Sequence, residues 1–71
     1  MIIYTSRLTH ENHSRQFTIQ RSDRSGWIAR EEDESASGKT TDIRDWHQVE
    51  ATIVLFKMKA SALKDEGWAE S

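Results

Sequence analysis

Residues 45–68 read DWHQVEATIVLFKMKASALKDEGW, and no other segment of the chain is long enough for a helix of about five turns. Asp45 and Gln48 have the three-residue spacing of a capping box, in which each side chain satisfies an early backbone N–H group. Gly67 favours the left-handed conformation that ends helices, and Trp68 follows where a Schellman motif packs its next residue against the helix. We therefore expect one long helix between these two signals.

Two apolar stripes run along this predicted helix. The first has the spacing that a helix buries against a sheet, and it consists of Val49, Ile53, Phe56, Ala60 and Leu63, with Phe56 as its central anchor. The second lies roughly opposite and consists of Ala51, Val54, Leu55, Met58 and Ala62. Two interpretations of the second stripe are open. In the first, the stripe has no binding role, because Ala and Met are good helix formers and isolated apolar residues on a surface are normal. In the second, the stripe is a patch that binds a protein partner, and the leading hypothesis is that this partner is a second copy of the chain.

Alternating apolar and polar residues before the helix predict four short strands, near residues 2–9, 16–21, 27–31 and 39–43. In the first we expect Ile2, Tyr4 and Leu8 to share a face, and in the second Phe17 and Ile19. The polar stretches HENHS, DRSG and SASG read as turns between the strands. The predicted fold is α+β: a small antiparallel β-meander of three to four strands, then one long C-terminal helix on one face of the sheet, in a single domain over residues 1–71.

Length and composition exclude several classes of protein. A chain of 71 residues buries only about 60% of its unfolded surface, so we expect one modest core and no catalytic cleft between two domains. The chain has no Cys, which excludes disulfides and thiolate metal sites. We expect neither a signal peptide nor a membrane span, and by elimination a cytoplasmic protein. The prediction is a non-enzymatic protein without a cofactor.

Two short motifs suggest metal chemistry and are explained more simply without it. The zincin pattern places two His four residues apart on a helix, but His10 and His13 in HENH are three apart and lie in a predicted turn. Residues 31–34 (EEDE) lack the alternate spacing and the Gly of a calcium loop, and in a strand their side chains alternate between faces. We interpret the acidic block as a charged edge or loop that discourages sheet-edge association, and we predict no metal site.

Nucleic-acid binding is the alternative to protein contact. The net charge of −2 lacks the basic excess of a dedicated nucleic-acid binder, but five Arg lie within residues 1–30. Trp27 lies between two of them in sequence, as a base-stacking residue does, although a Trp on a central strand also packs beneath a helix. We expect Trp46 in the core and Trp68 at the helix cap. The alternative surface comprises Arg21, Arg24, Trp27 and Arg30.

Nearly the full chain resembles the WGR domain, which occurs in some poly(ADP-ribose) polymerases and in small bacterial proteins. Residues 15–19 (RQFTI) look like the first long strand of that family, and residues 38–40 (GKT) look like its Gly-Gln-Thr turn. Gly67 and Trp68 are similar to the Gly-Tyr pair that ends the family's helix. The resemblance implies a twisted antiparallel sheet with one helix, and a role in nucleic-acid binding and domain contacts.

The chain departs from this family at its signature. The name-giving Trp-Gly-Arg tripeptide falls on residues 31–33, which read EED, and the Lys usual near the end of the helix falls on Leu63. Three carboxylates at that place would repel a phosphate backbone. We therefore expect the fold of the family without its interaction with DNA.

Overall fold

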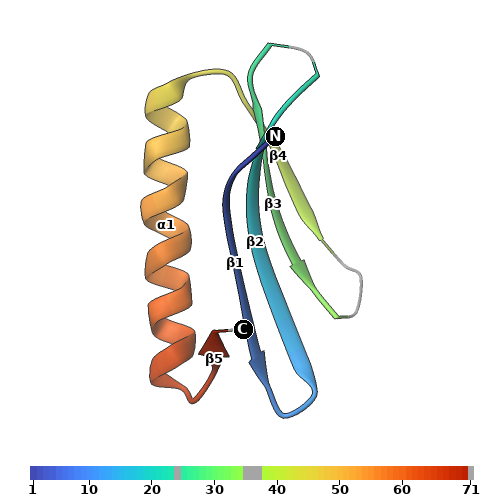
Figure 1. The fold of residues 1–71 in the computed structure, drawn as a ribbon. Coiled ribbons are helices and arrows are strands. Elements are labelled where there is room, and N and C mark those ends of the chain that lie inside the picture. Colours follow the sequence, from blue (N-terminus) through green and yellow to red (C-terminus); the bar gives the residue numbers. More distant parts are fainter. Residues whose placement is uncertain (24, 35–37, 71) are drawn as a thin grey trace.

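The computed structural model describes residues 1–23, 25–34 and 38–70, and it arranges them as one antiparallel sheet with a single helix along one face (Figure 1). The elements are β1 (Ile2–His10), β2 (His13–Arg21), β3 (Trp27–Asp33), β4 (Lys39–Ile43), α1 (Trp46–Asp65) and β5 (Ala69–Glu70). The strand order across the sheet is β4-β3-β2-β1-β5. The predicted α+β meander followed by a helix is confirmed, and β5 is an addition that the sequence did not predict.

The strands β1 and β2 are longer than predicted because a two-residue turn joins them. The expected turn over residues 10–14 shrinks to Glu11 and Asn12, whose φ angles are +48° and +69°. Two consecutive positive φ angles are the mark of a type I′ hairpin turn, whose twist matches that of the flanking strands. The prediction that the second strand begins at residue 16 was therefore wrong, since β2 begins at His13. In the same way β3 extends two residues past its predicted end, to Asp33.

A β-bulge near the start of β1 changes which residues face the helix. The pairing with β2 shifts by one residue between Ile2 and Tyr4, which inserts Ile3 into the strand. As a result Ile3 and Tyr4 pack against the core, whereas Ile2 is exposed. The expectation that Ile2 shares an inner face with Tyr4 and Leu8 was wrong for this reason.

The core is a single layer between the sheet and α1. It consists of Leu8, Phe17, Ile19, Ala29 and Ile43 from the strands and Val49, Phe56, Ala60 and Leu63 from the helix. The ring of Phe56 lies 5.1 Å from the ring of Phe17 and 6.3 Å from that of Tyr4, measured between centroids. Phe56 is thus the central anchor, as predicted, and each fully buried side chain of this size stabilises the fold by about 1.5–3 kcal/mol.

Helix α1 begins and ends where the sequence signals placed its ends, although the Asp45 carboxylate bonds to His47 and not to Gln48 as in a capping box. Asp45 is the N-cap, and its carboxylate accepts a hydrogen bond from the backbone N–H of His47 at 3.1 Å. At the other end Gly67 has φ +105°, and the N–H of Trp68 donates to the carbonyl of Leu63 at 3.0 Å. This six-to-one hydrogen bond is that of a Schellman motif, so the sequence located the helix end correctly.

The Schellman turn returns the chain to the sheet and creates β5. Trp68 stacks on His10 with ring centroids 5.6 Å apart. Ala69 and Glu70 then pair with Thr9 and Leu8, which places β5 (dark red in Figure 1) between the end of α1 and β1. Two residues are too few to show any periodicity, which is why the sequence did not reveal this strand.

Candidate functional site

The outer face of α1 carries the second apolar stripe, which we call the outer strip: Ala51, Val54, Leu55, Met58 and Ala62. Its three large side chains are strongly exposed, with Val54 at 57%, Leu55 at 48% and Met58 at 65% of their full accessible surface. The two alanines are exposed as well. All five predicted residues are therefore exposed on α1, with Val54 and Met58 facing away from the core. Leu55 lies at the sheet side of the strip, where it lines a pocket with Ala29 and Phe56.

The outer strip is continuous along the helix. Residues three and four positions apart are neighbours on a helix surface, with Cβ atoms about 5–6 Å apart, and this spacing links every member of the strip to at least one other. Charged side chains lie at its flanks, with Lys57 on the β1 side and Lys59 on the β3 side. A surface of this kind offers apolar contact area and no reactive group.

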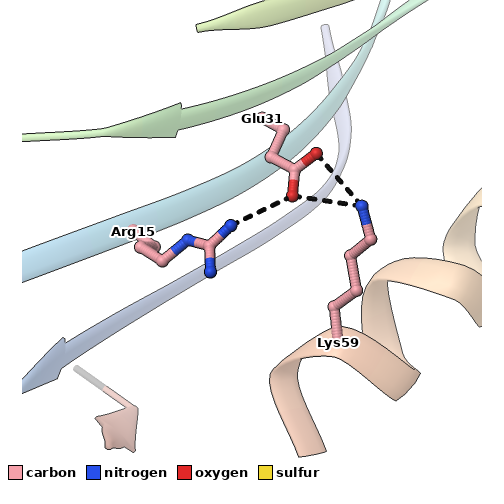
Figure 2. Close-up of polar contacts among 3 residues, drawn as sticks. All are labelled: Arg15, Glu31 and Lys59. Atoms are coloured by element: carbon pink, nitrogen blue, oxygen red, sulfur yellow. Dashed lines mark hydrogen bonds and ion pairs between the residues drawn. The ribbon is translucent and has the colours of Figure 1, made fainter. Parts of the chain in front are cut away.

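A cluster of charged side chains fixes α1 to the sheet beside the strip (Figure 2). The ammonium of Lys59 donates to both carboxylate oxygens of Glu31, at 3.1 and 3.2 Å, and the guanidinium of Arg15 donates to one of them at 3.3 Å. These residues come from α1, β3 and β2, and the side chain of Glu31 is only 19% exposed. Two cations therefore compensate the carboxylate at a position where burial would otherwise destabilise it.

The acidic block of residues 31–34 is divided between the sheet and a turn: its first three residues belong to β3, and Glu34 lies in the turn that follows. The predicted edge is wrong for Glu31, and the predicted loop is correct for Glu34. Strand β3 lies between β2 and β4, and Glu31 pairs with Lys39 of β4. The carboxylates are dispersed, as strand alternation predicted, because Glu32 lies 3.7 Å from Arg30 on the opposite face of the sheet. The sequence did not reveal the role of Glu31, since its partners come from two other elements.

Glu34, the last acidic residue of the block, joins the β1–β2 hairpin to the end of β3. Its carboxylate contacts the imidazole of His13 and accepts a hydrogen bond from the backbone N–H of Ser14 at 2.6 Å. The hydrogen bond that the Glu34 carboxylate accepts from the imidazole raises the pKa of His13 above its ordinary value and holds the pKa of Glu34 below its usual value. The other histidine of HENH, His10, stacks on Trp68 and so has a different neighbour.

Of the predicted nucleic-acid surface, the structure brings Arg21 and Trp27 together as partners on neighbouring strands and places Arg30 on the opposite face of the sheet. Trp27 is on the helix side of β3, where it packs on the core and against Trp46 with ring centroids 5.4 Å apart. Arg24 lies outside the described residues. Trp46 itself is about half exposed, so its predicted place in the core was wrong.

Searches for a recognisable site add no further feature. Among the described residues there is no group of three or more His, Cys, Asp or Glu side chains arranged to hold a metal ion. In the same part of the chain, no helix has the length and apolar character needed to cross a bilayer. Comparison with protein-family models, curated proteins and solved structures finds no match to this chain.

Proposed function

We propose that this protein is a non-enzymatic interaction module that self-associates through the outer strip of α1. The observation that carries this proposal is the strong exposure of Val54, Leu55 and Met58 on one continuous helix face. A helix that is apolar on both sides binds something on each. The sheet covers the inner side of α1. For the outer side we take a second copy of the chain as the partner, because a second copy is always available to the protein.

The expected geometry is a two-fold pair in which each outer strip meets its copy, since identical surfaces pair most simply around a two-fold axis. Full burial of a large apolar side chain contributes about 1.5–3 kcal/mol, and these side chains are already about half covered. Six of them, three from each copy, then contribute roughly 4–9 kcal/mol, against an association cost of roughly 4–15 kcal/mol. The proposal is therefore a weak dimer that forms at high protein concentration.

The test is the molecular mass in solution, measured by light scattering between roughly 10 μM and 1 mM protein. The mass should rise above the 8.3 kDa of one chain as concentration increases. Leu55→Glu and Met58→Glu should each abolish the rise, because a carboxylate in the interface loses its hydration without a partner. Thr40→Glu is the matched control, since it adds the same charge at an exposed position of β4 away from the helix.

Two results would end this proposal. One is a mass of 8.3 kDa at every concentration tested. The other is a rise in mass that persists in both helix variants while their circular dichroism and urea midpoints show that they are folded. The resemblance to the WGR domain and the binding of nucleic acid stay predictions. Because Trp27 packs against Trp46, no specific observation favours nucleic-acid binding.

A further inference from the structure

A groove separates α1 from the outer edge of β1, and it is distinct from the outer strip. Strand β5 pairs only with Leu8 and Thr9, so residues 2–7 of β1 have no strand partner on that edge in the described part of the chain. The groove has a volume of about 300 Å³. The residues of its lining that matter here are Tyr4, Ser6, Lys57, Ser61, Lys64 and Glu70.

One end of this groove already holds a carboxylate from an extended segment. The hydroxyl of Ser6 donates to one oxygen of Glu70 at 3.1 Å, and the ammonium of Lys64 lies 3.5 Å from the other oxygen. Ser6 is buried, so its hydroxyl points into the groove and away from solvent. Glu70 lies on the helix side of the sheet because it pairs with Leu8, whose side chain is in the core. The groove thus binds an acidic side chain of β5.

The same arrangement continues past the end of β5. Along the free edge of β1 the next helix-side positions after Leu8 are Ser6 and Tyr4, about 7 Å apart. On α1, Lys57 precedes Lys64 by seven residues, or about 10 Å along the helix axis. A strand that continued β5 would therefore place another side chain beside Lys57. Among the described residues, Lys57 forms no ion pair.

We propose that this groove binds an acidic, extended peptide of a partner protein, which adds to the free edge of β1 as an antiparallel strand in line with β5. Backbone hydrogen bonds to residues 2–7 would hold the peptide, and alternate carboxylates would lie at Lys57 and Ser61. A second copy is a poorer occupant, because a two-fold pairing of β1 edges brings Lys57 of both copies together. The proposal does not depend on self-association, since it uses a different surface.

The probe is a fluorescently labelled nine-residue peptide of alternating Thr and Glu, whose binding is followed by anisotropy and by amide NMR shifts. We expect a dissociation constant below about 1 mM, with shifts concentrated in residues 2–7 and around Ser61. Lys57→Glu should weaken binding by about tenfold or more, because it reverses the charge that meets the peptide. Lys39→Glu, the same charge reversal on β4, is the matched control and should leave the affinity unchanged.

A second peptide separates strand addition from simple charge attraction. Replacing its Thr residues with Pro keeps every carboxylate but removes alternate backbone N–H groups, so binding should be lost. The proposal is overturned by absence of binding at about 1 mM peptide, or by equal weakening in Lys57→Glu and Lys39→Glu. It is also overturned by full binding of the Pro peptide.

Discussion

The contact between Glu31 and Lys59 makes a quantitative prediction about how α1 is held to the sheet. A double-mutant cycle with Glu31→Gln and Lys59→Met isolates the energy of this pair. Both oxygens of Glu31 accept from Lys59, at 3.1 and 3.2 Å, but the side chain of Lys59 is 41% exposed. Exposed pairs are worth about 0.2–1 kcal/mol, and contacting residues in one network couple by about 0.5–3 kcal/mol. For this half-screened pair we expect a coupling energy of about 1 kcal/mol.

The order of the single variants follows from the third member of the cluster. In Lys59→Met the carboxylate keeps its 3.3 Å hydrogen bond from Arg15, whereas Glu31→Gln leaves two neighbouring cations without a counter-charge. Glu31→Gln should therefore destabilise the fold more than Lys59→Met does. Both are measured by urea unfolding, followed by Trp fluorescence, and the coupling should shrink in about 1 M salt.

The control for this cycle is Lys57→Met, which removes an equivalent charge from the same helix. Lys57 lies in the groove on the β1 side of α1, away from Glu31. Its coupling to Glu31→Gln should be close to zero. The reasoning would be refuted by a Glu31–Lys59 coupling below about 0.3 kcal/mol, or by equal couplings for Lys57 and Lys59.

Two further predictions concern the core and the hairpin. Phe56→Ala should lower the free energy of unfolding by about 3–5 kcal/mol in a urea titration. Val54→Ala on the exposed face should change the free energy of unfolding by under about 0.5 kcal/mol, and similar losses in the two variants would contradict the assigned core. The NMR-titrated pKa of His13 should lie above 6.5 and fall back in Glu34→Gln. Because Glu34 raises the pKa of His13, the stabilisation that comes from protonated His13 is complete below pH 6.5 and is lost as pH rises through the raised pKa. The stabilisation that comes from ionised Glu34 is lost in acid, as pH falls through the lowered pKa of Glu34.

The sequence predicted those elements in which only one face is buried against another layer, because such burial imposes a regular pattern of apolar and polar residues. Phe17 and Ile19 alternate with polar residues because only one face of β2 meets α1, and this pattern identified the strand. The first residues of β2 are polar on both faces, since they extend beyond the covered part of the sheet, and no alternation marks them. Their strand conformation is set by the hairpin turn at Glu11 and Asn12, which has no Gly to announce it.

The candidate surfaces also differ in whether they follow from one element alone or from the way that several elements pack together. The outer strip could be predicted because the rotation of a helix alone places Val54 and Met58 opposite Phe56. The Glu31 cluster could not, because it requires the pairing of β2 with β3 and the position of α1 across them. The groove beside Lys57 also depends on strand order, since β5 pairs only with the end of β1 and leaves the outer side of residues 2–7 without a strand partner among the described residues.

The contrast between the two solvent-facing sides of the molecule supports contact through the helix. On the sheet face away from α1, the pairing aligns Thr5, Thr18, Arg30 and Thr40 in one row across four strands. Thr18 is buried in this row by its neighbours, although no second layer covers it in the described part of the chain. The exposed side chains of this row are polar or charged, so water hydrates them. The outer strip has no such compensation, because its exposed atoms are apolar and gain free energy only when another surface removes them from water.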